Sequence, residues 1–262
     1  MGLNDDYVVS PTLVFDEVHA RKKSKSQKAS AIAIKNVSFY VAQGEAVGLI
    51  ARNVDGAGVI LEAISGSIQV ERGQVLIRRR IAWLTSVTEF SPDEQLGEAL
   101  SVAAMYLALS GSSLKSKVAD VLASLDLVDS AHQLVDDVDP LDVERARLRI
   151  AIEANPAMVI IGDKAARSVA ITEEAGRALI GDYLERGGSV LIVDETPRAM
   201  RRICLRMIWL RDGEVIMDGQ RIEVGREFSR SVGFASDKTK LAQLFRRYRR
   251  QYRGVRLDLE RL

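Results

Sequence analysis

Residues 44–60 constrain the fold of this chain more than any other stretch. Ala46–Ile50 has the pattern of a short apolar strand and leads into a turn of small residues. Apolar residues then recur at helical spacing, at Val59, Ile60, Ala63 and Ile64. A strand, a small-residue turn and a helix in this order form the layout of a phosphate-binding loop, which presents backbone N–H groups to phosphate. The stretch therefore predicts an α/β fold.

The loop keeps this layout but lacks the residues that act on phosphate. In the pattern G-x-x-x-x-G-K-[ST], the Lys neutralises the phosphates and the hydroxyl holds Mg²⁺. Here Ala57 and Gly58 stand at those two positions. Loss of the Lys removes a charge pair of about 4 kcal/mol at ~4 Å and an effective dielectric of ~20, or about a thousandfold in affinity. Asp55 adds repulsion unless its side chain points outward.

We therefore expect no cofactor and no metal at this loop, with weak binding of ATP and Mg²⁺ as the alternative. The residues of this vestigial phosphate loop are Ala51, Arg52, Asn53, Gly56, Ala57 and Gly58.

The composition is that of an ordinary globular protein and excludes several other classes. The 262 residues are 47% hydrophobic and 28% charged, with a net charge of +1, so the chain has no overall bias toward nucleic acid. The single cysteine, Cys204, excludes an internal disulfide framework and fits a reducing compartment. No run approaches the ~20 apolar residues of a membrane span, and the acidic start at Asp5 and Asp6 is unlike a signal peptide. We expect a cytoplasmic protein.

Strand patterns dominate both ends of the chain, and helix patterns dominate the middle. Alternating or continuous apolar residues predict strands at 13–18, 32–41, 46–50, 74–77, 81–84, 158–161, 190–193, 207–210 and 214–217. Arg72-Gly73 predicts a turn, and Asp212-Gly213 predicts a hairpin. Ser91 as N-cap, followed by Pro92 and Glu94, predicts a helix start. Further helices are expected after Asp139-Pro140, over about 172–186 and, as a short one, after Thr196-Pro197.

The order of these elements resembles the ATP-binding subunit of ABC transporters, and within it the branch that exports capsule, O-antigen and teichoic acid polysaccharides. The resemblance covers roughly residues 12–220. It rests on matches at 33–39, 44–50, 64–66, 73–75, 90–100, 145–148, 155–156 and 208–213, and at Gly219. It implies a P-loop-NTPase-like ABC nucleotide-binding-domain fold, with a mixed sheet, antiparallel strands at the N-terminus and a helical insert.

The chain departs from this family at each position that the family uses on ATP. The Lys and the Mg²⁺-binding Ser fall on Ala57 and Gly58, and one loop Gly falls on Val54. The Asp that assists the metal falls on Gly162, the catalytic Glu on Asp163, the switch His on Glu195, and the adenine-stacking aromatic near Lys22. The signature tract falls on residues 141–144, where Asp142 and Glu144 would cap their own helix and interact favourably with its dipole. Because two subunits of the family share each ATP site, pairing with a competent partner would leave both sites damaged.

Asp163 and Glu195 are thus vestigial catalytic positions rather than expected catalytic residues. Asp163 is either a surviving general base or a capping acid beside Lys164. Glu195 and Asp194 are expected to form a surface ion pair with Arg198, Arg201 or Arg202. His19 and His132 have no second ligand at metal spacing, so we interpret both as structural.

The tail from Lys238 is basic and carries an apolar stripe at Leu241, Leu244, Phe245, Tyr248 and Tyr252. The stripe either packs on the protein or lies on an anionic membrane or a permease. Stacking of its arginines and tyrosines on RNA is the third alternative, which the balanced overall charge disfavours.

Taken together, the sequence predicts a catalytically inactive ABC-ATPase-like subunit in polysaccharide export, peripheral at the cytoplasmic side of the inner membrane. Its expected partners are a permease, gripped by the insert and the loop near Phe90, or a glycan-synthesis protein, or a second copy in a homodimer, but not nucleic acid. The alternatives are a slow, divergent ATPase and a soluble regulator without a transporter. The expected domains are an N-terminal tail (1–10), the ATPase-like domain (11–225, with the insert at about 92–150) and a basic extension (226–262).

Overall fold

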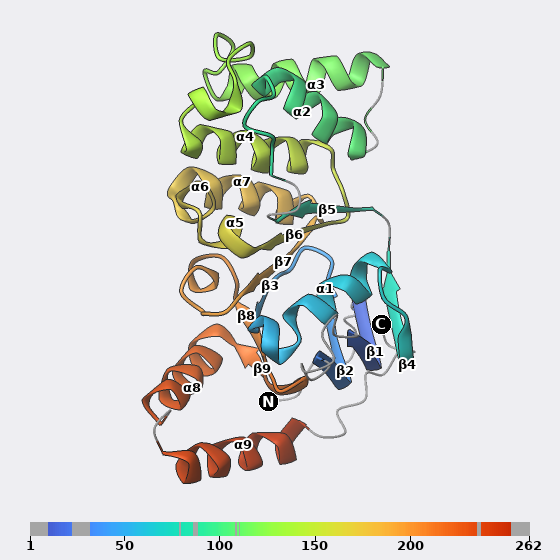
Figure 1. Cartoon of the computed structure of the whole chain (residues 1–262), viewed down its shortest axis with the longest axis vertical. Helices are drawn as coiled ribbons and strands as arrows, with labels where there is room; N and C mark the ends of the chain where they lie inside the picture. Colours follow the sequence, from blue (N-terminus) through green and yellow to red (C-terminus); the bar gives the residue numbers. More distant parts are fainter. Residues whose placement is uncertain are drawn as a thin grey trace.

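The computed structural model describes residues 10–22, 32–78, 80–85, 89–107, 109, 111–234 and 237–252. A six-stranded sheet forms the centre of the molecule (Figure 1). Its strands in spatial order are β5 (Ile81–Leu84), β6 (Met158–Gly162), β7 (Ser189–Asp194), β3 (Ala46–Ile50), β8 (Arg206–Arg211) and β9 (Glu214–Gln220). All neighbouring pairs are parallel except β8 and β9, which form the predicted hairpin at Asp212-Gly213. The continuous apolar runs are buried on both faces, as parallel strands require.

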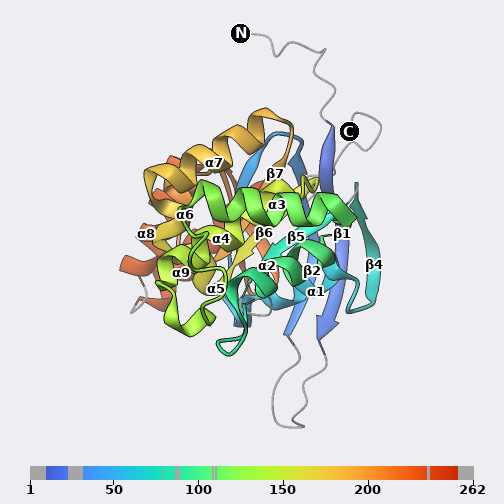
Figure 2. The same cartoon turned by 90° about the horizontal axis from the view of Figure 1, so that it is seen from above.

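A smaller antiparallel sheet lies beside it, in the order β2 (Ile32–Ala42), β1 (Pro11–Lys22) and β4 (Val70–Ile77). Figure 2 shows this sheet at one side of the molecule. The predicted turn at Arg72-Gly73 is wrong, because β4 runs through it. Gly73 has a φ of +79°, and the pairing with β1 shifts register between Asp16 and His19. The glycine therefore accommodates an irregularity within the strand pair rather than a chain reversal.

Helix α1 (Ala57–Ser65) follows the loop and packs between the two sheets. The helical insert, with α2 (Leu96–Tyr106), α3 (Gly111–Ser124) and α4 (Pro140–Glu153), forms one end of the molecule (Figure 1). It has its own apolar core around Leu96, Leu100, Val121 and Ile150. Helices α5 (Asp163–Arg167), α6 (Val169–Thr172) and α7 (Glu174–Glu185) follow β6, so the helix expected over 172–186 is confirmed as α7.

The predicted helix start at Ser91 is wrong, because α2 begins at Leu96. The chain between them pairs with residues near 134 instead: Gln95 bridges to Leu134, and the Val135 N–H donates to the Glu94 carbonyl at 2.9 Å. A long-range pairing thus takes the backbone groups that a first helical turn would use. The short helix expected after Thr196-Pro197 is a single 3₁₀ turn at Met200–Arg202.

Helices α8 (Arg221–Gly233) and α9 (Lys238–Tyr252) close the end of the molecule opposite the insert (Figure 1). The predicted boundary between residues 225 and 226 falls inside α8. In α9, Leu244, Phe245 and Tyr248 are buried in the same core as β8 and β9, and Phe245 meets the Trp209 ring at 5.6 Å. Of the alternatives for the tail stripe, packing on the protein therefore holds for these three side chains, which are not free to enter a membrane; the Tyr252 side chain lies outside the described part of the structure.

Candidate functional site

The carboxyl ends of the parallel strands gather the residues singled out in the sequence. Ile50 at the end of β3 pairs in register with Asp194 at the end of β7, and Gly162 at the end of β6 pairs with Val193. The loop after β3 and the segments after β6 and β7 therefore share one edge of the sheet, where open α/β sheets bind ligands.

Backbone N–H groups of the phosphate-like loop are engaged within the loop itself. A 3₁₀ turn, η1 (Asn53–Asp55), separates β3 from α1. The N–H groups of Asp55 and Ala57 donate to the Arg52 carbonyl at 2.9 and 3.3 Å, and that of Gly56 donates to the Asn53 carbonyl at 3.1 Å. Gly56 has a φ of +109°, which favours glycine. These three donors are therefore committed to loop carbonyls in this conformation.

An internal ion pair occupies the loop. The Asp55 carboxylate is buried and accepts hydrogen bonds from Arg52 Nε at 2.6 Å and Nη2 at 3.0 Å. It also accepts from the Asp212 N–H at 3.2 Å, while the Gly213 N–H donates to the Asp55 carbonyl at 3.0 Å. Burial by itself would raise the pKa of Asp55, but the hydrogen bonds from Arg52 and Asp212 hold it below its usual value. The alternative in which Asp55 points outward is wrong: its side chain points inward and ties the loop to the β8–β9 hairpin.

Ala57 and Gly58, at the positions of the lysine and hydroxyl in the pattern, supply no polar side chain. Ala57 is 5% exposed and packs in the core with α1. Lys22, near the expected adenine position, forms an ion pair with Glu62 on α1.

Asp194, the last residue of β7, is buried at this edge of the sheet, with a side chain that is 1% exposed. It pairs with Arg167 at 3.2 Å and accepts from the Glu195 N–H at 2.7 Å. Burial raises its pKa above the ordinary value, against the opposing effect of these contacts. The ion pair expected with residue 198, 201 or 202 is therefore wrong for Asp194. Its place directly after the four apolar residues of β7 was the sequence signal that it would be buried.

Glu195 is exposed, and Asp163 is the first residue of α5, directly after β6. The side chain of Asp163 lies outside the described part of the structure, as do those of the tail from residue 249 onward and the whole of Arg79. The structure thus brings the backbones of Asp163 and Glu195 to the loop edge.

The tract at residues 141–144 opens α4, and its acids are paired within the protein. The cap is Asp139, whose carboxylate accepts from the Leu141 N–H at 2.7 Å, so the expected capping by Asp142 and Glu144 is wrong. Asp142 bonds Arg145 at 2.9 Å, and Glu144 pairs with Arg147. Arg145 and Arg147, the arginines nearest the start of this helix, are thus both engaged by carboxylates of the protein.

Arg147 is the buried cation of the insert, at 3% exposure. It donates to the Thr85 carbonyl at 3.0 Å and lies over the Phe90 ring at 5.8 Å. It therefore links α4 to the segment that follows β5.

A hollow of about 610 Å³ opens beside this link, between β5 and α2. Its lining is mainly apolar and includes Trp83, Phe90 and Tyr106. On the same helix, Tyr106 is 86% exposed and Met105 is 63% exposed. An apolar hollow with an exposed aromatic side chain in its lining, and an exposed methionine next to it in the chain, is typical of a surface that binds another protein.

Metal and thiol chemistry have little support among the described residues, which contain no group of three or more potential ligands that could hold a metal ion. His132 is exposed, with Nδ1 3.4 Å from Gln95 Oε1, and His19 lies within β1. Cys204 is fully buried, and burial raises the pKa of its thiol well above the usual range. None of the described helices is long and apolar enough to cross a lipid bilayer.

Comparisons with known proteins support the resemblance. No family model matches the chain. It is 24% identical over 226 residues to the teichoic acids export ATP-binding protein TagH of Lactococcus lactis, covering 86% of this chain and 48% of that protein. It is 23% identical over 217 residues to the O-antigen export system ATP-binding protein RfbB of Myxococcus xanthus, covering 82% and 50%. The chain thus spans about half the length of these two relatives.

Solved structures agree on the fold. An ATP-binding subunit of an ABC transporter superimposes with a TM-score of 0.65 at 20% identity, covering 83% of this chain and 93% of that one. A dimeric ATP-binding cassette bound to ADP and phosphate gives a TM-score of 0.64 at 19% identity, covering 80% and 98%. The predicted ABC nucleotide-binding-domain fold is confirmed, and so is the resemblance to ATP-binding subunits of polysaccharide export.

Proposed function

We propose that this chain acts as a catalytically inactive, ABC-ATPase-like subunit of polysaccharide export and works through protein contacts. The observation that supports this proposal most directly is that the polar groups of the phosphate-like loop bond to one another. Three of its N–H groups donate to loop carbonyls, and its Arg52 and Asp55 side chains form an ion pair with each other. A polyanion at this loop would have to break these bonds without help from a lysine at residue 57.

The partner in this proposal is a membrane permease, which docks on the hollow between β5 and α2. The hollow is supported as a docking surface by its apolar lining and by the exposed Tyr106 and Met105 beside it. Attachment to a permease would hold the chain at the cytoplasmic face of the inner membrane, and pairing of two copies would follow the dimeric cassettes to which it is similar. The domain limits at residues 11 and 225 and the vestigial positions Asp163 and Glu195 also remain proposals.

A divergent, slow ATPase is the second candidate, and the names of the relatives favour it. Those relatives are ATP-binding proteins, and one similar structure holds ADP and phosphate. In this chain Asp163 would be the acid that acts on water, since it directly follows β6. The loop would then have to open before nucleotide binds, which predicts slow, weak association.

Calorimetry with Mg·ATP separates the two candidates. The native chain is expected to give no heat at millimolar nucleotide, whereas a dissociation constant below about 100 µM, or −5.5 kcal/mol, would contradict the inactive-subunit proposal. Turnover that disappears in Asp163→Ala would establish the ATPase instead. The variant Ala57→Lys/Gly58→Ser serves as comparison. We expect it to bind ATP weakly as well, because Asp55 still occupies the loop.

The docking part of the proposal is tested with Tyr106→Ala. Truncation at an exposed site is expected to leave stability within about 0.5 kcal/mol of the native value. It should weaken nucleotide-independent capture of the exporter's permease at least about tenfold if the aromatic ring is an anchor. Leu205→Ala, also an exposed apolar residue at 74%, is the matched control outside the hollow. Equal capture by both variants would contradict docking at this surface.

A further inference from the structure

A second polar hollow, of about 390 Å³, lies at the opposite edge of the six-stranded sheet. Its walls are the segments that lead into β3, β5, β6 and β7, together with the start of β1. Three arginines line it, namely Arg78, Arg80 and Arg186, with the amide side chains of Gln43 and Asn155 beside them. No aspartate or glutamate is among the described residues of its lining.

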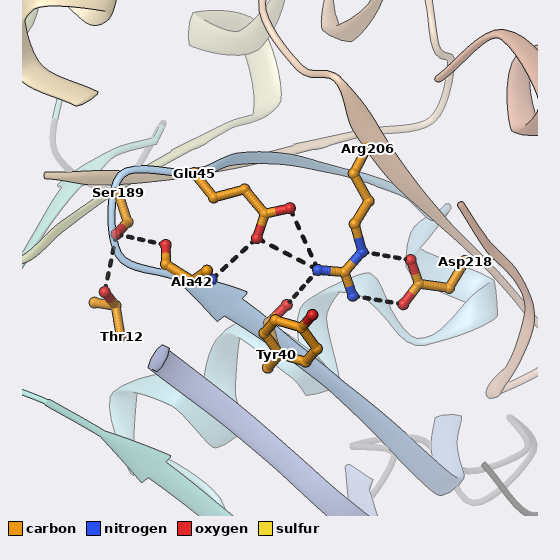
Figure 3. Close-up of polar contacts among 7 residues, drawn as sticks. All are labelled: Thr12, Tyr40, Ala42, Glu45, Ser189, Arg206 and Asp218. Carbon is orange, nitrogen blue, oxygen red and sulfur yellow. Dashed lines mark hydrogen bonds and ion pairs between the residues drawn. The ribbon is translucent and has the colours of Figure 1, made fainter. Parts of the chain in front are cut away.

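Hydrogen bonds between distant segments fix the walls of this hollow. The Gln43 N–H donates to the Ser10 carbonyl, and the Arg78 N–H to the Thr12 carbonyl, each at 2.9 Å. The Thr12 hydroxyl lies 2.9 Å from the Ser189 hydroxyl, and the Ser189 hydroxyl donates to the Ala42 carbonyl (Figure 3). Backbone groups of the rim thus pair with one another and hold these segments together.

The three guanidinium groups contact neutral acceptors and retain spare donors. Arg78 Nη1 donates to Ser10 Oγ at 2.9 Å, Arg80 Nη1 to the Leu107 carbonyl at 2.8 Å, and Arg186 Nε to the Asp182 carbonyl at 3.2 Å. A guanidinium group carries five N–H donors. Within the part of the chain that the structure describes, none of the three has a carboxylate oxygen within 4 Å.

Arg206 shows the contrasting case nearby. Figure 3 shows its guanidinium between two carboxylates, with Asp218 at 2.7 Å and Glu45 at 3.4 Å. Its charge is matched inside the protein, so it is a structural cation. Among the described residues, the three arginines that line the hollow form no such ion pair, although Glu153 acts on Arg186 from beyond ion-pair distance and Arg80 directs one N–H to the Leu107 carbonyl outside the hollow.

We propose that this hollow binds a phosphate-bearing ligand with at least two phosphate groups, such as a diphosphate. Guanidinium groups pair with phosphate oxygens through two parallel hydrogen bonds, and three of them around one cavity suit an anion with several oxygens. The volume fits a small ligand. The site lies across the sheet from the phosphate-like loop, so it does not depend on whether that loop binds nucleotide.

Inorganic pyrophosphate is the first probe, titrated into the native chain by calorimetry at low ionic strength. We expect saturable binding that weakens at least about tenfold, or 1.4 kcal/mol, in each of Arg78→Gln and Arg186→Gln. Binding should also weaken as KCl is added. Arg72→Gln changes an arginine of β4, the strand that ends just before Arg78, and lies outside the hollow; it is the matched control and should bind as the native chain does.

Folding is checked first, because a loss of binding through unfolding would not test the site. The three side chains are exposed, so their glutamine variants are expected to keep the native melting temperature without ligand. Arg186→Lys keeps the charge but loses the planar fork, and its affinity should fall between those of the native chain and Arg186→Gln.

Absence of heat up to about 10 mM pyrophosphate, a limit near −2.7 kcal/mol, would overturn the proposal. So would affinity that is unchanged in the glutamine variants. ADP is the second probe and tests a diphosphate carried on a larger molecule. If ADP binding is weakened by the same variants, it occupies the hollow and supports the proposal. If ADP alone binds and the variants do not affect it, its site lies elsewhere and the proposal fails.

Discussion

Replacing Arg52 with alanine is the sharpest test of the charge arrangement in the loop. Arg52 is half exposed, whereas the Asp55 carboxylate that it contacts is only 5% exposed. The variant therefore leaves a buried carboxylate with one direct hydrogen bond, from the Asp212 N–H. Asp55→Asn in the same background removes that charge and keeps an acceptor for the N–H. We expect the double variant to be more stable than Arg52→Ala alone.

The magnitude follows from the cost of a stranded charge. Breaking a fully buried ion pair costs about 3–5 kcal/mol. We expect a loss of about 2 kcal/mol here, because Arg52 is half exposed, the Asp212 N–H still bonds the carboxylate, and surface ion pairs contribute less than buried ones. That corresponds to a decrease in melting temperature of about 4–8 °C for a chain of this size. Asp55→Asn added to Arg52→Ala should restore at least half of the decrease, since non-additivity is expected for residues in contact.

The effect depends on pH in a defined direction. In the native chain the pKa of Asp55 is below its usual value, so its contribution to stability is present above the unfolded pKa and is lost as pH falls through the folded pKa. Without Arg52, burial acts with less opposition and raises this pKa. The Arg52→Ala variant is then less stable than the native chain at neutral pH, and this loss of stability becomes smaller as Asp55 becomes protonated. The stability difference should therefore narrow below about pH 4.

Thermal unfolding followed by circular dichroism between pH 3 and 8 measures these differences. Additive losses in the double variant, or a loss in Arg52→Ala that does not change with pH, would refute the reasoning. Asp55 would then not be a buried charge that Arg52 compensates.

Three further predictions concern other parts of the molecule. Arg206→Met should lower the free energy of unfolding in urea by about 2–3 kcal/mol, because it leaves the Asp218 carboxylate without its bidentate partner; a loss below about 0.5 kcal/mol would contradict a structural role. Gly188→Ala should cost about 3 kcal/mol or more, because an added Cβ would lie 2.2 Å from the Tyr183 ring, and an unchanged melting temperature would contradict this packing. Cys204 should react with a thiol reagent only after denaturant is added, and rapid labelling of the native chain would show that it is accessible.

Local sequence patterns predicted most elements of the fold. The strands at Ala46–Ile50 and Ile81–Leu84 begin and end where the apolar runs predicted, and Asp139-Pro140 begins a helix as expected. These elements depend on side chains close together in the chain, so the sequence contains the information that specifies them. The helix start at Ser91 failed for the opposite reason, since residues near 134 take the backbone bonds of that segment.

The residues of the candidate site were identified from the sequence, but their partners were not. Asp194 was expected to pair with an arginine four to eight residues away, and it pairs instead with Arg167 at the end of α5. The sequence did not specify the orientation of the Asp55 side chain, which depends on its contact with the hairpin at Asp212. Both contacts join segments that are distant along the chain, and no local pattern specifies which two segments meet.

The sequence by itself determined the α/β order of elements, the phosphate-loop layout, and the absence of its lysine and hydroxyl at Ala57 and Gly58, because these are properties of residue type and spacing. The tertiary structure decided which charges are matched. It pairs Asp55 with Arg52 in the loop and leaves three arginines around a hollow at the opposite edge of the sheet without carboxylate partners among the described residues. The physical reason is that ionic contacts act over a few ångströms in space, and only the folded chain brings the groups within that distance.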